Sequence, residues 1–161
     1  MCHYATAQVC LGGHAITGNI DVDHAMLSPS CPYCGEKTIT HCPSCNAQIR
    51  GDYIAPDVYN LLDYHPPAYC WNCGEPFPWT KAKLDAAEAL AKETNVLSDD
   101  EIKRLHESLP NVIVDKPNTI LSARRISAIL KKLPKVAATD IHDVIVEIAA
   151  ETAKRVLWPG G

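Results

Sequence analysis

The sequence predicts a small α+β fold in which short β-hairpins precede a bundle of about four α-helices. All eight cysteines lie before residue 74, and seven of them, with one histidine, form closely spaced pairs. Residues 81–161 contain no cysteine and are rich in Ala, Leu, Ile, Lys and Glu, which favour helix. A chain of 161 residues can form two small domains, and we place them at 1–79 and 80–161.

Four pairs of potential metal ligands follow one another along the first domain. They are Cys10 and His14, Cys31 and Cys34, Cys42 and Cys45, and Cys70 and Cys73. A tight turn aims both side chains of a pair at one point, and a tetrahedral zinc ion needs four ligands, so two pairs complete one site. We therefore expect these eight residues to bind two Zn²⁺ ions per chain.

Residues that tolerate a positive φ support the turns. Gly35, Asn46 and Gly74 each follow a cysteine pair, and Gly12 and Gly13 lie inside the first pair. The grouping of the pairs stays open. A sequential grouping closes the shortest loops and is favoured; a nested grouping would join 31–34 with 42–45, and a cross-brace would interleave the pairs.

The predicted sites are structural and not catalytic. Four protein ligands fill each one, whereas a catalytic zinc ion usually keeps a position for water. The sequence contains no Gly-rich phosphate loop, nucleophile elbow or H-E-x-x-H motif, so we expect no enzymatic activity. A cryptic activity of Cys2, which lies outside the pairs with no identifiable base beside it, is the exception left open.

The knuckles with a trailing glycine, and the strand-like segments 15–17 and 38–40 between them, resemble tandem zinc ribbons of the rubredoxin-knuckle type. More closely, the order of segments 6–10, 13–14, 31–35, 38–39, 42–43, 49–51 and 69–74 resembles an uncharacterised bacterial family of double-zinc-ribbon proteins with a helical C-terminal region. The resemblance implies a double zinc ribbon over 1–79 and supplies no activity, because zinc ribbons serve several functions.

Residues 51–80, here the acidic aromatic segment, contain no Lys or Arg but seven of the ten aromatic residues. Residues 1–80 carry a formal charge of −5, which two zinc sites would bring to about −8 because each thiolate adds a negative charge. The rings form either a small core or a surface that binds a protein partner. The expected partner residues are Tyr53, Tyr59, Tyr64, Tyr69, Trp71 and Trp79.

Helix signals follow in succession. Thr80 can cap a helix over 81–93, and Ser98 with Glu101 forms a capping box for a second helix that ends before Pro110. Apolar periodicity predicts a third helix over 119–133 and a last one from about 140 to 157. The last helix is apolar nearly all round, so either the other helices enclose it or it packs against a second copy or another protein.

The segment 116–135 is basic and contains no acidic side chain after Asp115. Its cations are Lys116, Arg124, Arg125, Lys131, Lys132 and Lys135. This segment is a solvated face, a surface that docks on the acidic first domain of its own or a neighbouring chain, or a nucleic-acid patch. Phosphates would be repelled by the acidic domain, which makes nucleic acid the less favoured partner.

These observations favour a non-enzymatic zinc-binding adaptor or scaffold protein, with a helical tail for oligomerisation or partner binding. A nucleic-acid-binding or regulatory protein that uses residues 116–135 is the alternative. We find no run of 18 apolar residues and no secretory signal pattern, so we expect a cytoplasmic protein without a membrane partner.

Overall fold

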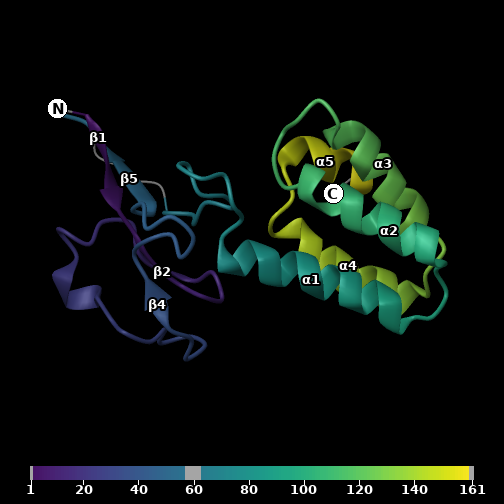
Figure 1. Cartoon of the computed structure of the whole chain (residues 1–161), viewed down its shortest axis with the longest axis horizontal. Helices are drawn as coiled ribbons and strands as arrows, with labels where there is room; N and C mark the ends of the chain where they lie inside the picture. Colours follow the sequence, from purple (N-terminus) through teal and green to yellow (C-terminus); the bar gives the residue numbers. More distant parts are fainter. Residues whose placement is uncertain (1, 57–62, 160–161) are drawn as a thin grey trace. The chain divides into compact units, whose positions relative to one another are not determined.

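The computed structural model describes residues 2–56 and 63–159 (Figure 1). The chain forms two compact units, Met1–Lys81 and Ala82–Gly161, which we call the N-terminal unit and the helical unit. Short strands and loops make up the first, and helices make up the second. The predicted α+β fold class is confirmed.

The N-terminal unit contains two small antiparallel sheets. In one, β1 (His3–Thr6) pairs with β5 (Arg50–Ile54). In the other, β2 (Gln8–Cys10) lies between β3 (Ala15–Thr17) and β4 (Thr38–Ile39). A 3-10 turn, η1 (His24–Met26), lies in the loop between β3 and β4. Both sheets are too small to be stable alone, so their stability depends on the side chains that the connecting turns bring together.

Backbone hydrogen bonds connect the two sheets. The N–H of Asp52 in β5 donates to the carbonyl of Gly18, just after β3, at 2.9 Å. A Cβ on Gly51 would lie 1.9 Å from the same carbonyl oxygen, so only glycine fits there. This close approach brings the end of the β2–β3 hairpin against β5.

A small core fills the N-terminal unit. It contains the buried side chains of Ala7, Val9, Ile49, Phe77 and Trp79, together with Cys42 and Cys70. The rings of Phe77 and Trp79 stack with centroids 4.6 Å apart, and the Trp79 indole N–H donates to the Pro67 carbonyl at 3.0 Å. Part of the acidic aromatic segment therefore belongs to the core.

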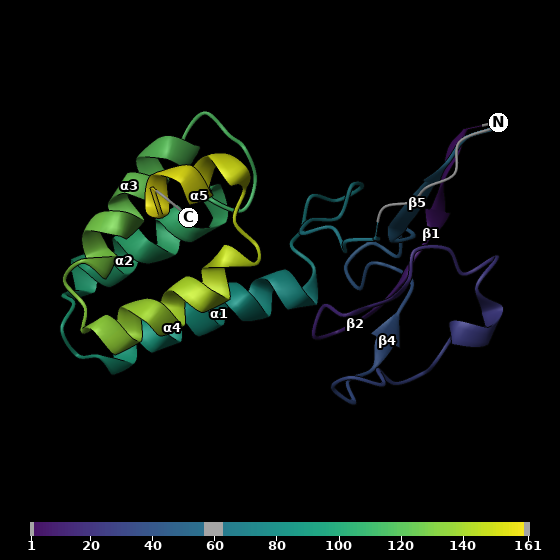
Figure 2. The ribbon, with the colours of Figure 1, turned by 180° about the vertical axis from the view of Figure 1, so that it is seen from behind.

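Five α-helices and a 3-10 turn form the rest of the described chain. They are α1 (Pro78–Glu93), α2 (Asp99–Ser108), η2 (Leu109–Asn111), α3 (Thr119–Leu130), α4 (Lys135–Val146) and α5 (Glu151–Leu157). Figures 1 and 2 show α1 and α4 side by side, with α2, α3 and α5 gathered against this pair. None of the described helices is long and apolar enough to cross a membrane.

The helix starts follow their capping signals in one case and not in another. The predicted capping box is confirmed, because the Ser98 hydroxyl accepts from the Glu101 N–H and the Glu101 carboxylate accepts from the Ser98 N–H. Thr80 is not a cap. Helix α1 begins earlier, at Pro78, since proline is favoured in the first turn of a helix, and Thr80 is completely buried inside it.

The predicted last helix is two helices. Helix α4 begins at Lys135 behind Pro134 and ends at Val146, and α5 begins only at Glu151. Ala150 between them is extended, and its N–H donates to the Val112 carbonyl at 2.8 Å. The residues at the break are good helix formers, so a tertiary hydrogen bond overrides local propensity.

The helical unit has an apolar core of ordinary type. Leu105, Ile126, Ile141 and Ile145 are almost completely buried, in a cluster with alanines and leucines from all five helices. Lys83 pairs with Glu147 at 2.5 Å, and Lys132 pairs with Glu101. We therefore expect the packing of side chains to hold this unit together.

Candidate metal centres

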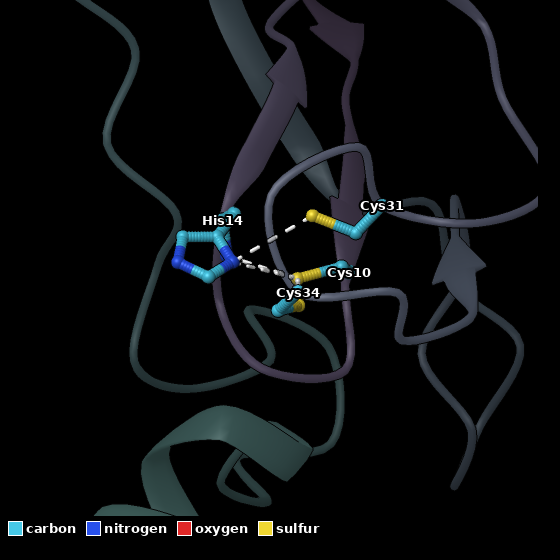
Figure 3. A group of neighbouring side chains, drawn as sticks. All are labelled: Cys10, His14, Cys31 and Cys34. Carbon is cyan, nitrogen blue, oxygen red and sulfur yellow. Dashed lines mark hydrogen bonds between the residues drawn. The ribbon is translucent and has the colours of Figure 1, made fainter.

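Cys10, His14, Cys31 and Cys34 converge in the first cluster, although two separate turns carry them (Figure 3). The sulfurs of Cys10 and Cys34 are 3.7 Å apart. The Nδ1 of His14 lies 3.5 Å from the Cys10 sulfur and 3.6 Å from the Cys31 sulfur. All four donor atoms lie within 4.8 Å of one another.

Cys42, Cys45, Cys70 and Cys73 form the second cluster in the same way. Sulfur–sulfur distances are 3.8 Å between Cys42 and Cys73 and 3.7 Å between Cys45 and Cys70. The structure thus adopts the sequential grouping of the four pairs. The nested and cross-brace groupings do not occur, because each pair meets its neighbour along the chain.

These distances test whether the residues fit a metal ion. A tetrahedron with metal–sulfur bonds of about 2.3 Å has sulfur–sulfur edges of about 3.8 Å, and a bond of about 2.0–2.1 Å to nitrogen gives sulfur–nitrogen edges of about 3.5 Å. The observed edges are 3.7–3.8 Å and 3.5–3.6 Å. A disulfide would need about 2.05 Å. Both donor sets therefore fit one tetrahedral ion each.

Three of the four turns are built alike. In each Cys-x-x-Cys turn, the backbone N–H of the residue four positions after the first cysteine donates to that cysteine's carbonyl. The N–H of the first cysteine donates to the carbonyl of the residue five positions after it. The bonds join Gly35 to Cys31, Cys31 to Glu36, Asn46 to Cys42, Cys42 to Ala47, Gly74 to Cys70, and Cys70 to Glu75, at 2.7–2.9 Å. The rubredoxin-type knuckle expected from the sequence is thus repeated three times.

The turn at Cys10 is one residue tighter. Gly13 donates to the Cys10 carbonyl at 2.9 Å, and Cys10 donates to the His14 carbonyl at 3.0 Å. The N–H of His14 also donates to the Cys10 sulfur at 3.1 Å. The histidine occupies the position that closes this turn, and its longer side chain carries Nδ1 back to the cysteine sulfurs (Figure 3).

Positive φ angles occur at four of the five turn residues that the sequence suggested, and Gly12 is the exception. Asn46 has φ 61°, Gly35 76° and Gly74 75°, each directly after a knuckle. Gly13 has φ 93°, and a Cβ there would lie 2.9 Å from the Cβ of Trp79. Gly13 is therefore restricted twice, by its backbone angle and by the core.

Hydrogen bonds to sulfur prepare two of the thiols for metal binding. The Asn72 amide donates to the Cys45 sulfur at 3.5 Å and, with the backbone N–H of Ala47, lowers the pKa of Cys45 to about 6. Burial raises the pKa of Cys31, but the backbone N–H groups of Tyr33 and Cys34 and hydrogen bonds with the Cys34 and Cys10 thiols together outweigh it and lower that pKa to about 7. These thiolates form readily near neutral pH, and the thiolate is the form that binds a metal ion.

The thiol of Cys73 resists ionisation when its cluster holds no metal ion. The Glu75 N–H lowers the pKa of Cys73, but burial and the three neighbouring thiols raise it to about 12 overall. Sulfurs this close cannot all be anionic without a cation between them. The donor set therefore holds negative charge fully only around a metal ion.

The aromatic residues of the acidic segment divide between core and surface. Trp79 is buried, Tyr64 and Tyr69 are half-buried, and Tyr53 and Trp71 are exposed. The Tyr64 hydroxyl donates to the Arg50 carbonyl at 2.8 Å. Tyr59 lies outside the described residues. Of the five expected partner residues that the structure describes, Tyr53 and Trp71 present their rings to solvent.

Two further residues join these rings, and sequence reasoning missed both. Tyr4 pairs with Tyr53 across β1 and β5, with ring centroids 5.2 Å apart. The Arg50 guanidinium lies between the rings of Tyr4 and Trp71, 4.8 Å from the Tyr4 centroid and 4.5 Å from the Trp71 centroid. We call Tyr53, Tyr4, Arg50 and Trp71 the aromatic–arginine ladder. The pairing of β1 with β5 creates this ladder. It could have been predicted only from the register that places Tyr4 opposite Tyr53.

Fold and sites together define a protein with two ribbon-type ligand clusters, one of three cysteines and a histidine and one of four cysteines, each with the geometry to hold a metal ion, and with a helical C-terminal region. The chain belongs to a family of uncharacterised proteins conserved in bacteria, DUF2321, whose model matches residues 3–157. No curated protein and no solved structure shows significant similarity to the chain.

Proposed function

We propose that the protein is a non-enzymatic adaptor in which two structural zinc ions hold the aromatic–arginine ladder in place for a protein partner. The ladder is the observation that carries this proposal. Its rings are about half exposed, at 50% for Tyr4, 49% for Tyr53 and 52% for Trp71. Tyr, Trp and Arg are the residues most enriched where binding energy is concentrated in protein interfaces.

Zinc is the proposed metal because of the donor set. Three thiolates with one imidazole, closed by four protein ligands, are typical of structural zinc. Four thiolates also suit iron, so the second site needs a direct test. Zinc is colourless in both sites, whereas iron bound by thiolates absorbs visible light. The purified protein is therefore expected to be colourless and to contain two zinc ions.

The ladder is pre-ordered, which favours binding. Arg50 is held between two rings, and the Trp71 indole N–H donates to the Gln48 carbonyl at 3.0 Å. Side chains that are already fixed lose little conformational entropy when a partner docks. The rigid turn at Cys70, which carries Trp71, links the order of this surface to the second metal site.

Charge indicates the chemistry of the partner. Residues 1–80 have a formal charge of −5, with Lys37 and Arg50 as their only cations, and zinc–thiolate sites would make this about −8. A positively charged segment of a protein is attracted to such a surface over about a Debye length. We therefore propose a basic protein segment that stacks on the ladder rings.

The closed geometry of both clusters supports a non-enzymatic role. Every ligand position of a tetrahedral ion is taken by Cys10, His14, Cys31 and Cys34 in one site and by the four remaining paired cysteines in the other. No position remains for a metal-bound water or substrate. Thiolate ligands need a reducing compartment, which supports a cytoplasmic location.

Co-purification from the cell tests the adaptor proposal. Tagged wild-type protein is compared with Tyr4→Ala/Trp71→Ala and with Tyr33→Ala, which removes a more exposed ring, 76% exposed, outside the ladder. Quantitative mass spectrometry is expected to show a basic partner that the double variant loses at least about tenfold and that Tyr33→Ala retains. An unchanged set of proteins on the double variant, with two zinc ions still bound, would contradict the proposal.

The helical unit carries exposed apolar side chains that are candidates for self-association. Ile120, Leu121 and Val136 are exposed, and Val136 is 73% exposed. Light scattering of the full-length protein during size exclusion measures the copy number. We expect Leu121→Glu/Val136→Glu to convert an oligomer to a monomer; a wild-type chain that is already monomeric would contradict oligomerisation.

Nucleic-acid binding through residues 116–135 has weaker support. Lys132 is already paired with Glu101, which leaves less positive charge on this segment. Arg124 and Arg125 on α3 are exposed and would contribute most. Retention on a nucleic-acid column at moderate salt, lost in Arg124→Glu/Arg125→Glu, would favour this alternative over the adaptor.

A further inference from the structure

An open cavity of about 460 Å³ lies in the helical unit where α3, α4 and the end of α5 meet. Its lining includes Leu130, Leu157 and Trp158 on the apolar side and Lys131 and Lys135 among the polar groups. Sites for small molecules typically measure about 300–1,000 Å³ and combine apolar walls with a few polar groups. The cavity has both the size and the composition of such a site.

The break between α4 and α5 creates this cavity. Because Ala150 is extended and bonded to Val112, α5 packs against α3 and does not continue along the axis of α4. Trp158, the first residue after α5, then meets His142 of α4 edge to face, with ring centroids 4.3 Å apart and an angle of 78°. One uninterrupted helix would have carried Trp158 away from α4.

The apolar wall is an extension of the core. Leu157 is part of the buried cluster, and Leu130, Ala138 and Trp158 pack against it while remaining partly exposed. A rigid aromatic ring beside aliphatic side chains suits a flat or branched apolar group. This wall determines what the body of a ligand can be.

Positive charge lies on one side of the same cavity. Lys131 directly follows α3, and Lys135 is the first residue of α4. Pro134 before it has no polar side chain to cap the helix, and residues 135–138 include no acidic group, so the first N–H groups of α4 add a partial positive charge. The one carboxylate of the lining, Asp143, is engaged by the His142 ring at 2.9 Å.

A second cavity continues this arrangement. It measures about 750 Å³, shares His142 and Trp158 with the first, and adds Lys154 and Arg155. Lys154 pairs with Glu151 at 2.9 Å, so the charge of one of these two cations is partly offset. Cations outnumber carboxylates in the lining of both cavities.

We propose that this cavity binds a small amphipathic anion, a molecule with an aromatic or aliphatic body and one carboxylate, phosphate or sulfonate group. The body lies against Leu130, Leu157 and Trp158, and the acid group is held by the ammonium groups of Lys131 and Lys135. The site belongs wholly to the helical unit. It is therefore independent of the metal centres and of the adaptor function.

Two dyes that differ by one charged group test the proposal on the full-length protein. The anion is 8-anilinonaphthalene-1-sulfonate, and the uncharged probe is N-phenyl-1-naphthylamine, which has the same rings. Fluorescence titrations are made with wild type, Lys131→Glu/Lys135→Glu and the control Lys103→Glu/Arg104→Glu, which makes the same charge change on exposed residues of α2.

We expect one anionic dye per chain, bound at least about tenfold more weakly by the 131/135 variant, because charge-assisted contacts are lost and like charges introduced. The control variant should change the affinity for the anionic dye less than about twofold. Neither variant should change the affinity for the neutral dye by more than about twofold. Equal weakening in the two double variants, or no saturable binding of the anionic dye, would overturn the proposal.

Indole N–H resonances provide a second readout that does not depend on dye fluorescence. The chain has three tryptophans, Trp71, Trp79 and Trp158. The anionic dye should shift the Trp158 resonance alone, and this shift should be lost in Lys131→Gln/Lys135→Gln, which avoids the repulsion of the glutamates. A shift confined to Trp71 or Trp79 would place the dye elsewhere and refute the site.

Discussion

The two units of this chain are stabilised by different means. In the helical unit, Leu105, Ile126 and Ile145 belong to a continuous apolar cluster. In the N-terminal unit, the buried clusters are small, and Cys10, Cys31, Cys42 and Cys70 are among their members. A core this small gives little stability, and the proposed metal coordination would supply what is missing. Metal should therefore be essential for the N-terminal unit and irrelevant to the helical unit.

Removal of the metal should have the largest effect. We expect Cys70→Ser, or a strong chelator, to unfold the N-terminal unit, because structural zinc contributes roughly 10–16 kcal/mol of binding energy to folding in small domains. The helices of 82–161 should persist. Residue-resolved amide spectra measure both at once, and Cys2→Ser, which changes the exposed cysteine outside the clusters, is the matched control.

A cavity in the core of the helical unit should affect the stability of that unit alone. Leu105 is completely buried in α2, and Leu105→Ala should cost about 2–5 kcal/mol of helical-unit stability because it leaves a cavity in the core. Thermal unfolding measures the loss, and the metal content should remain unchanged. Loss of zinc in this variant would mean that the two units do not fold independently.

Two glycines of the N-terminal unit should respond differently to substitution. Gly13→Ala meets a positive φ of 93° and the Trp79 side chain, whereas Gly35→Ala meets a φ of 76° in open space. A strained φ alone costs roughly 1–2 kcal/mol, and a core clash adds to it. Denaturant titration should therefore rank Gly13→Ala as the more destabilising; the reverse order would contradict the packing of Trp79 against this turn.

A pH dependence from Glu101 should be the smallest effect. Lys132 and the backbone N–H of Ser98 lower the pKa of Glu101 from 4.5 to about 2. A carboxylate with a lowered folded-state pKa stabilises the fold above its unfolded pKa, and this stabilisation is lost as the pH falls through 4.5 toward 2. Thermal melts of wild type and Glu101→Gln should converge in this range and differ at neutral pH; parallel curves would contradict the pairing.

Local patterns in the sequence were enough to predict the eight residues that gather in the two clusters of potential metal ligands. The spacing within each pair determines a turn, and the positive φ at Gly35, Asn46 and Gly74 is a local requirement of that turn. The capping box at Ser98 is local as well. Such features depend on a few neighbouring residues, so the sequence specifies them directly.

Features that depend on distant residues could not be predicted from local sequence patterns. The extended Ala150 has helix-forming neighbours, and its bond to Val112 ends the helix. Likewise, nothing local distinguishes exposed Trp71 from buried Trp79. The ladder needs β1 to pair with β5, and the anion cavity needs the break after α4. Each of these arises from long-range packing, for which periodicity and composition carry little information.

Native mass spectrometry of the full-length protein determines whether each chain holds two zinc ions, since it counts the metal ions on each intact chain. We expect two zinc ions per wild-type chain. His14→Ala, which removes a ligand of the first cluster alone, should leave one zinc ion held by Cys42, Cys45, Cys70 and Cys73. A wild-type chain that carries a single zinc ion, or an iron cluster in either site, would contradict two independent structural zinc centres.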